Sequence, residues 1–349
     1  MALKRCQMLY QQGNCLNTKK TFTPPCRICV AVCPHGAISE GYELSEKQCT
    51  ECGLCAAACP SNGFVDRLAA QLEAYLWSER KEYMIHCPQA ASGEMEIPCI
   101  GILDRDSWST LIMKAASKTV TLITGDCGVC PDQAACAASV RIFKELHRDW
   151  PGHPEVKVLV QQTAGEATDP AARNDKETEK KRGKDLRRQS RKLLGRWLPE
   201  AGTEAMTPIP RSRRWLLRVL EEQPQQKAPF QALTVSGQCT NCSVCVSVCP
   251  QGALDDREED GRRLLILEPL KCVQCGRCIN VCRAKALRLE TKNLSARLLS
   301  GKILIHEGNI RTCTQCGRRV YDDREPPLCV ICASASPEGR DHLFSSSKR

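Results

Sequence analysis

Residues 239–250 read CTNCSVCVSVCP, and residues 272–282 read CVQCGRCINVC. Both runs space their cysteines as C-x2-C-x2-C-x3-C, the spacing with which proteins bind 4Fe-4S clusters. In a two-cluster arrangement the first three cysteines of a run bind one cluster, and the fourth cysteine binds the other. The spacing therefore predicts two 4Fe-4S clusters, one on Cys239, Cys242, Cys245 and Cys282 and the other on Cys272, Cys275, Cys278 and Cys249.

The residues that surround these runs resemble the dicluster ferredoxins of bacteria. Residues 249–254, CPQGAL, look like the family's turn from the fourth cysteine into a strand. Arg283 stands where the family usually has a proline after the second run. Proline there sets a turn and binds no metal, so the replacement leaves the ligand set intact. The resemblance implies a small α+β module that moves single electrons.

An earlier part of the chain repeats the pattern. A complete run occupies residues 49–59, and a second run at residues 26–33 has Thr23 in place of its first cysteine. Threonine is not an expected ligand of an iron–sulfur cluster. This cluster is therefore either a 3Fe-4S cluster or takes its fourth bond from a cysteine outside the loop, with Cys15 and Cys6 as the candidates.

We favour Cys15, because turn-forming pairs at residues 13–14 and 24–25 indicate a looped insertion that folds back on the cluster. With Cys15 included, the first module is expected to hold two further 4Fe-4S clusters. The predicted ligand sets are Cys15, Cys26, Cys29 and Cys59 for one cluster, and Cys33, Cys49, Cys52 and Cys55 for the other.

Residues 80–162 have a different pattern of apolar and polar residues. Short apolar runs at 82–86, 95–98, 119–124 and 156–160 alternate with helix-like stretches, which predicts a small α/β domain with a largely parallel sheet. Sites in such sheets form beyond the carboxyl ends of the strands. Five cysteines follow these runs and are expected to converge there: Cys87, Cys99, Cys127, Cys130 and Cys136.

The segments PCIG at 98–101 and GDC at 125–127, with the strand and helix between them, resemble the iron–sulfur delta subunit of methyl-viologen-reducing hydrogenases. The resemblance implies a 2Fe-2S cluster on four of the five cysteines. It also implies electron transfer from a hydrogenase or formate dehydrogenase to a heterodisulfide-reductase-like partner.

The segment CGVCP at residues 127–131 has a competing interpretation, because the same pattern after a strand is typical of a thioredoxin dithiol. In that case the chain would be a cluster-linked disulfide reductase that uses Cys127 and Cys130. Any one of the five thiols can also be a buried structural cysteine. We favour the cluster, because a dithiol would not need Cys87, Cys99 and Cys136.

The C-terminal region carries two knuckles, and their cysteines predict one tetrahedral metal site on Cys313, Cys316, Cys329 and Cys332. The twelve-residue interval between the knuckles, Gly317 and Phe344 resemble the rubredoxin-like domain of rubrerythrins, although Ala333 replaces the usual glycine. Iron would make this site a redox centre, whereas zinc would make it a structural clip. Four cysteine ligands suit both metals.

The net charge of +10 is unevenly distributed, with ten basic and three acidic residues between 176 and 196. Such a run is either a solvated linker or a docking arm for an acidic partner subunit. Beyond this run, residues 215–220 indicate a short helix after Pro208 and Pro210. Binding to nucleic acid is not expected, because the basic run lacks interleaved aromatic residues. Dinucleotide and nucleoside triphosphate motifs are also absent.

The 26 cysteines exclude an ordinary disulfide framework, because C-x2-C spacing without a secretory signal is typical of metal binding. No apolar run approaches the roughly 18 residues of a spanning helix. We therefore expect a soluble, cytoplasmic protein of an anaerobic cell.

The sequence predicts a multi-domain α+β chain that relays electrons between the catalytic subunits of an anaerobic oxidoreductase complex. Its expected parts are a ferredoxin module (1–79), an α/β domain (80–162), a charged linker or docking arm (163–230), a second ferredoxin module (231–300) and a C-terminal metal ribbon (301–349).

Overall fold

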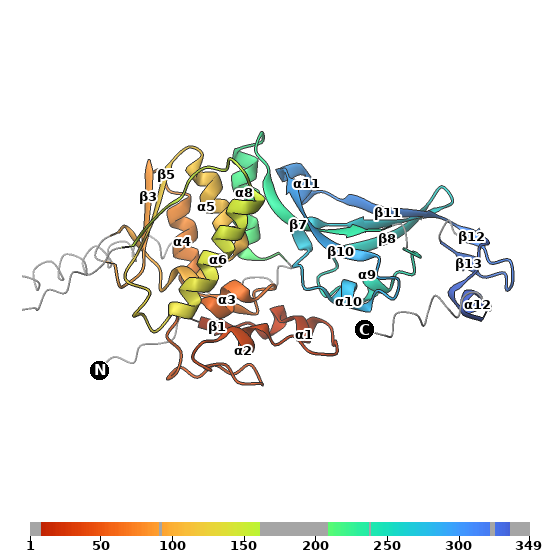
Figure 1. Cartoon of the computed structure of the whole chain (residues 1–349), viewed down its shortest axis with the longest axis horizontal. Helices are drawn as coiled ribbons and strands as arrows, with labels where there is room; N and C mark the ends of the chain where they lie inside the picture. The colour runs from red at the N-terminus through yellow and green to blue at the C-terminus, as the bar shows by residue number, and fades with distance from the viewer. Residues whose placement is uncertain (1–7, 91–92, 161–208, 237–238, 322–324, 336–349) are drawn as a thin grey trace, which may run out of the picture.

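A computed structural model describes residues 8–90, 93–160, 209–236, 239–321 and 325–335. Cys6, Phe344 and the basic run at 176–196 lie outside the described residues. Figure 1 shows the first module below the helices of the middle domain, with the second module beside them and the C-terminal knuckles beyond it.

The first module begins and ends on a short antiparallel ribbon, in which β1 (Met8–Tyr10) pairs with β2 (Phe64–Asp66). Between these strands the chain forms α1 (Leu16–Lys19), α2 (Ile28–Val32) and α3 (Leu54–Ala58). Its small core packs Met8, Ile38 and Phe64 against cysteine side chains. A core this small gives little cohesion, so bound clusters would be a main source of stability.

The middle domain has the predicted parallel sheet, with strand order β4-β3-β5-β6. Figure 1 shows its helices on one side of this sheet. The strands are β3 (Glu82–His86), β4 (Met95–Glu96), β5 (Thr119–Thr124) and β6 (Lys157–Val160), and the helices are α4 (Ala69–Leu76), α5 (Arg105–Ala115) and α6 (Gln133–Asp149). The four predicted strands agree with these bounds to within two residues, whereas α4 was not predicted.

The first module and the middle domain share one hydrophobic core. Gly53 precedes α3 with a φ of 76°, a conformation that glycine adopts without strain. A Cβ at this position would lie 2.7 Å from the Cβ of Ile102, in the 3₁₀ turn η2 (Ile100–Ile102). Because Gly53 has no side chain, the backbone beside Cys52 can approach the turn that follows Cys99.

The described end of the predicted linker is packed against the middle domain. α8 (Arg211–Glu222) buries Trp215, Leu216 and Val219, and lies against α5. Arg213 forms an ion pair with Asp106 of α5 at 2.6 Å. The short helix predicted around residues 215–220 is present as α8, and its apolar face packs on the middle domain.

The second module contains two antiparallel sheets. β7 (Ala228–Val235) pairs with β10 (Leu287–Leu294), and β9 lies between β8 and β11. The other elements are β8 (Leu254–Glu259), β9 (Arg262–Leu267), β11 (Ile303–Asn309), α9 (Val244–Val248), η4 (Pro269–Lys271), α10 (Arg277–Val281) and α11 (Ala296–Ser300).

Two predicted boundaries of this module are shifted. Strand β7 begins at Ala228 rather than after 230, and strand β11 joins the second module although residues 301–349 were predicted to form the C-terminal domain. Strand β11 covers the edge of β9, whose backbone groups need a partner on both sides. The knuckle pair itself consists of β12 (Arg311–Thr312), β13 (Arg319–Val320) and α12 (Val330–Ala335).

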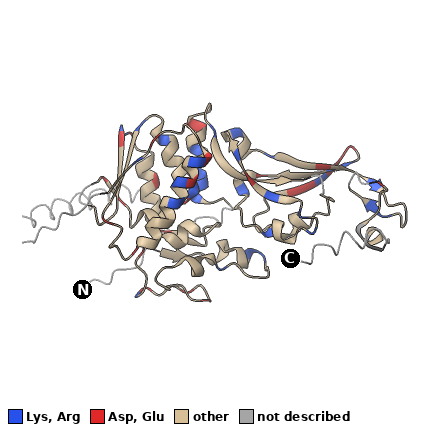
Figure 2. Cartoon of the chain, in the orientation of Figure 1, with Lys and Arg blue, Asp and Glu red and all other residues tan. Residues whose placement is uncertain are grey.

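Among the described helices, none combines the length and the apolar character that crossing a bilayer requires. Figure 2 shows basic residues on α5, α8 and α1, among other parts of the fold.

Candidate iron–sulfur sites

The four cysteine runs share a backbone feature that the spacing alone does not reveal. The third residue after each fourth cysteine has a positive φ, which turns the chain back. The next residue then donates its backbone N–H to the sulfur of that cysteine. The turning residues are Gly36, Asn62, Gly252 and Lys285, with φ of 59°, 56°, 60° and 49°. The N–H···S pairs are Ala37 to Cys33 at 3.3 Å, Gly63 to Cys59 at 3.0 Å, Ala253 to Cys249 at 3.2 Å and Ala286 to Cys282 at 3.3 Å.

The run with the missing cysteine also differs in its backbone. In the three complete runs, positive φ values flank the second cysteine, at Glu51 and Gly53, at Asn241 and Ser243, and at Gln274 and Gly276. In the incomplete run Arg27 follows Cys26 with a φ of −127°. The loop therefore departs from the repeat where Thr23 replaces a cysteine.

Site 1 lies in the first module. It comprises Cys33, the last cysteine of the incomplete run, together with Cys49, Cys52 and Cys55 of the complete run. Burial raises the pKa of the Cys55 thiol, and the neighbouring Cys52, Cys49 and Cys33 raise it further. The same four residues form one predicted ligand set, and the structure brings them together.

Site 2 comprises Cys15, Cys26, Cys29 and Cys59, which all line one pocket. Burial raises the pKa of Cys29 to about 11, and Cys59, Cys26 and Cys15 also act on it. Cys15 is placed by the turn before α1, where its backbone is the N-cap. The structure thus puts the favoured candidate with the other three cysteines.

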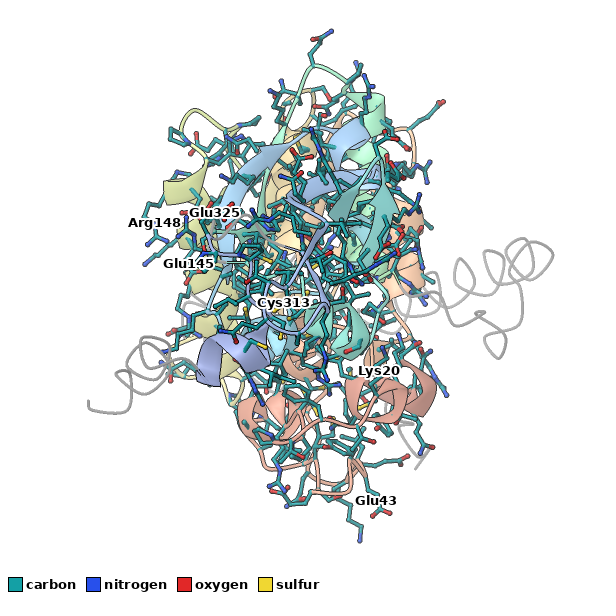
Figure 3. All side chains as sticks on the ribbon, turned by 90° about the vertical axis from the view of Figure 1, so that its right-hand side faces the viewer. Lys20, Glu43, Glu145, Arg148, Cys313 and Glu325 are labelled. Atoms are coloured by element: carbon teal, nitrogen blue, oxygen red, sulfur yellow. The ribbon has the colours of Figure 1, made fainter. Side chains whose placement is uncertain are left out.

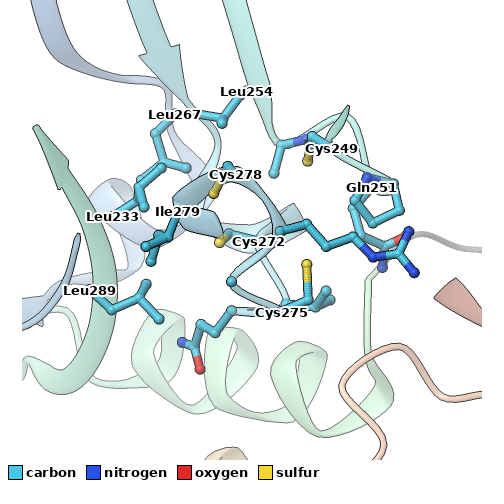
Figure 4. A pocket seen from close by; sticks show the side chains of 16 residues that line it. Leu233, Cys249, Gln251, Leu254, Leu267, Cys272, Cys275, Cys278, Ile279 and Leu289 are labelled. Atoms are coloured by element: carbon cyan, nitrogen blue, oxygen red, sulfur yellow. Dashed lines mark hydrogen bonds between the residues drawn. The ribbon is translucent and has the colours of Figure 1, made fainter. Parts of the chain in front are cut away.

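Site 3 comprises Cys249, Cys272, Cys275 and Cys278, and Figure 4 shows their sulfurs around one apolar pocket. Burial raises the pKa of Cys278 to about 12, and the other three cysteines contribute. The lining also includes the apolar side chains of Leu233, Leu254, Leu267 and Leu289.

Site 4 comprises Cys239, Cys242, Cys245 and Cys282. Burial raises the pKa of Cys245 to about 12, with further contributions from Cys239 and Cys242. Cys282 packs in the same hydrophobic cluster as Cys245. Both predicted ligand sets of the second module are thus drawn from neighbouring loops.

The middle domain brings together four of its five cysteines, which we call the middle site: Cys87, Cys99, Cys127 and Cys136. They follow β3, β4 and β5 or lie in α6, at the predicted carboxyl edge of the sheet. The sulfurs of Cys127 and Cys136 are 3.0 Å apart. Burial raises the pKa of Cys136, and Cys127, Cys99 and Cys87 raise it further.

Cys130 has a different environment. Its sulfur accepts the backbone N–H of Asp132 at 3.4 Å. The sequence did not distinguish the fifth cysteine, because Cys130 occupies a plausible redox motif. Cys136, which lies one helical turn into α6, is the cysteine whose sulfur contacts that of Cys127, at 3.0 Å.

The C-terminal site gathers Cys313, Cys316, Cys329 and Cys332, whose sulfurs all lie within 4.8 Å of one another. Backbone N–H groups, that of Cys329 foremost, lower the pKa of Cys313 to about 6. Figure 3 shows Cys313 in the part of the molecule that faces the viewer. A tetrahedron of thiolates is the geometry that a single iron or zinc ion requires.

The donor sets fit iron–sulfur clusters. Sites 1 to 3 each combine four thiols with apolar surroundings, and backbone N–H groups point at sulfurs in all four ferredoxin sites. Cluster binding requires thiolates, so the raised pKa values mean that loading releases protons. N–H···S bonds then stabilise the thiolates and tune the reduction potential.

Three residues near these sites were missed by sequence reasoning. Asp132 accepts Thr50 Oγ1 at 2.6 Å and faces His35 Nε2 at 2.8 Å, between site 1 and the middle site. Asn17 and Arg277 lie between sites 2 and 3. No local pattern marks such residues, because their partners are far away in the sequence.

Comparison with known protein families finds two matches. Residues 238–286 match a 4Fe-4S dicluster domain, and residues 42–64 match a 4Fe-4S binding domain. The first segment holds all cysteines of sites 3 and 4, and the second holds Cys49, Cys52, Cys55 and Cys59.

One curated relative is the ferredoxin-type protein NapH of Haemophilus influenzae, which is 37% identical over 57 residues. The match covers 16% of this chain and 20% of that protein, so the chain spans about a fifth of the relative's length. The chain thus contains 4Fe-4S domains, and these findings support an iron–sulfur electron-transfer role.

Proposed function

We propose that this chain is a multi-cluster electron-transfer subunit that relays single electrons between the catalytic subunits of an oxidoreductase complex. A hydrogenase, a formate dehydrogenase or a heterodisulfide-reductase-like protein are the proposed partners. The supporting observation is the succession of cysteine sites across the fold. The middle site is followed by sites 1 and 2, then by sites 3 and 4, and finally by the C-terminal site.

At both ends of this succession, interactions between particular residues connect neighbouring sites. Cys52 of site 1 acts on the pKa of Cys99 in the middle site, so the two sites are close. At the other end, the side chain of Asn241 in the site 4 loop donates to the carbonyl of Tyr321, which lies between the two knuckles, at 3.3 Å. Arg263 also stacks over the Tyr321 ring at 4.3 Å.

The proposed cofactors are four 4Fe-4S clusters on sites 1 to 4, a 2Fe-2S cluster on the middle site and one iron or zinc ion on the C-terminal site. Iron–sulfur clusters accept and donate one electron at a time. The cysteines would hold the clusters through their thiolates, and backbone N–H groups would donate to the sulfurs. A Cys15 ligand makes site 2 a four-cysteine site, which favours 4Fe-4S over 3Fe-4S there.

The relay is tested with anaerobically purified full-length chain. We expect it to pass electrons from dithionite to an added one-electron acceptor, and to show no turnover of H₂, formate or a disulfide on its own. Substrate turnover by the isolated chain, with only a dye as electron source, would contradict the relay.

The alternative of a disulfide reductase depends on Cys127 and Cys130 as a pair. The 3.0 Å contact between Cys127 and Cys136 instead groups Cys127 with the middle site. We expect Cys130→Ser to keep the 2Fe-2S signal and Cys136→Ser to lose it. Loss of a disulfide reductase activity in Cys130→Ser would support the alternative.

A further inference from the structure

The two ferredoxin modules meet where α1 faces α9 and α10. Lys20, which directly follows α1, donates through Nζ to the carbonyl of Ser247 in α9 at 2.7 Å. Lys19 donates through Nζ to Oε1 of Gln251, two residues after Cys249, at 2.5 Å. Figure 3 shows Lys20 at the border between the modules. Sites 2 and 3 therefore lie on either side of this junction.

Arg277 is the buried side chain of the junction, with 4% of its surface exposed. It lies between Cys275 and Cys278 in the site 3 loop and extends into the first module. Its guanidinium donates to the carbonyl of Lys20 at 2.7 Å and to Oδ1 of Asn17 at 3.1 Å. It also stacks over the ring of Phe22 at 5.0 Å. A buried arginine is costly unless its donors are paired, so these contacts fix its position.

Asn17 connects this arginine to a cysteine of site 2. Its Oδ1 accepts the backbone N–H of Cys26 at 2.9 Å, and its Nδ2 donates to the carbonyl of the same residue at 2.9 Å. The path from Cys26 through Asn17 and Arg277 to Cys278 therefore consists of covalent bonds and two hydrogen bonds.

We propose that electrons cross between the two modules at this junction, and that Arg277 is the positioning residue that joins site 2 to site 3 and raises the reduction potential of site 3. The inference rests on the proposed relay function and adds the place of the internal crossing. A positive charge near a redox site favours its reduced form. The guanidinium of an arginine side chain carries the positive charge that this effect requires.

Opposite charges lie on the two sides of the first module. Lys19, Lys20 and Arg277 surround the junction, whereas Asp132 of the middle domain lies beside site 1, where it accepts Thr50 Oγ1 at 2.6 Å and faces His35 Nε2 at 2.8 Å. Negative charge disfavours reduction and positive charge favours it. A cluster beside the junction would therefore be reduced more readily than a cluster beside Asp132.

The crossing is a one-electron step. Site 2 loses one electron and site 3 gains it, while no bond forms or breaks and no proton moves. In the test, dithionite is the reductant that supplies the electron.

The test compares four full-length proteins, purified anaerobically: wild type, Arg277→Gln, Arg277→Lys and Arg288→Gln. Arg288 is the matched control, because it belongs to the same module, is exposed and pairs only with nearby Glu290 at 2.6 Å among the described contacts. Potentiometric titration followed by EPR gives the midpoint potential of site 3, whose signal is the one that Cys275→Ser removes. Broadening of the EPR signals reports the magnetic interaction between sites 2 and 3.

We expect Arg277→Gln to make reduction of site 3 about tenfold less favourable, a shift of about −59 mV for one electron. The magnetic interaction should also weaken. Arg277→Lys should keep most of the potential, because it keeps the charge, but should lose interaction, because an ammonium cannot reproduce the planar fork. Arg288→Gln should match wild type in both readouts.

Equal potentials and equal interactions in Arg277→Gln and Arg288→Gln would overturn the crossing. If Arg277→Gln does not fold, the interaction measured in Arg277→Lys decides, and an unchanged interaction overturns the inference. Failure of the relay function gives a different result. In that case the wild-type protein itself would lack acid-labile sulfide and cluster EPR signals, which would contradict both proposals.

Discussion

At the scale of single residues, the cysteine spacing determines most of the proposed ligand sets, since the first three positions of each run lie on one tight loop. The choice of Cys15 depended on turn-forming residues around an insertion, and the structure places Cys15 in the site 2 pocket. The sequence could not indicate Arg277, because its contacts reach residues 257 and 260 positions away.

Cys15→Ser should remove one ligand of site 2. We expect its cluster to be lost or converted to a 3Fe-4S form, because a hydroxyl is a poor ligand for iron in such clusters. The measurement is iron content together with EPR of the oxidised protein. Cys6→Ser is the control, and a loss of iron there with an unchanged Cys15→Ser protein would show that the assignment is wrong.

Asp66 is buried, and one of its carboxylate oxygens, Oδ2, has no hydrogen-bond partner among the described residues. Its other oxygen accepts the backbone N–H of Leu68 at 2.7 Å. Burial raises the pKa of Asp66 above 3.8, and Glu51 adds to the shift. A carboxyl with a raised pKa favours the folded state while it is protonated, and this contribution is lost as the pH rises through the folded-state pKa.

Asp66→Asn should therefore stabilise the protein at pH 7 to 8, by roughly 1 kcal/mol, because it removes a buried charge and keeps the acceptor for Leu68. The advantage should shrink as the pH is lowered towards 5. Thermal unfolding followed by circular dichroism at several pH values measures it. A variant that is less stable than wild type at pH 8 would contradict the expected cost of this carboxylate.

At the scale of elements, the hydrophobic patterns predicted the strands and helices of the middle domain, because each buries one regular face. The predicted domain boundaries differ from the structure where an element packs against a part of the fold that is distant in the sequence. α8 is amphipathic and packs on α5, and β11 follows the last cysteine run but completes the sheet of β9. The apolar residues at 215–220 predict the helix itself, but neither stretch of sequence indicates which element it contacts.

The turn after each fourth cysteine makes a prediction at this scale. Gly252 has a φ of 60° and nothing within 4 Å of the place where a Cβ would stand. Gly252→Ala should therefore cost about 1 kcal/mol through backbone strain alone, without a steric clash. The thermal unfolding midpoint of the loaded protein reports this loss. An unchanged midpoint would mean that the turn tolerates a side chain, as it does at Lys285 in the equivalent position.

The packing of α8 gives a second prediction. Arg213 and Asp106 have side chains that are only 5% and 13% exposed, and Arg213 also donates to the carbonyl of Cys272 at 2.9 Å. Arg213→Gln leaves Asp106 buried without its cation, so we expect a loss of about 3 kcal/mol. Arg218→Gln is the control, since its ion pair with Glu222 is exposed and should contribute less than about 1 kcal/mol. Equal unfolding midpoints for the two variants would contradict the buried pair.

At the scale of the whole molecule, two ferredoxin modules, a parallel-sheet domain and a knuckle pair present their cysteine sites in one succession. The expected number of sites follows from the 26 cysteines and their spacing. Their order in space was not, because it depends on how the modules pack. The same packing puts Asp132 at one end of the first module and Arg277 at the other.

The most direct test of the proposed relay is the content of iron, zinc and acid-labile sulfide per chain in anaerobically purified protein, read beside low-temperature EPR before and after dithionite. Four 4Fe-4S clusters and a 2Fe-2S cluster predict about 18 iron with one zinc, or about 19 iron without zinc. About 16 iron with two free thiols at Cys127 and Cys130 would instead support the dithiol enzyme. Protein that retains no sulfide under these conditions would contradict the iron–sulfur relay.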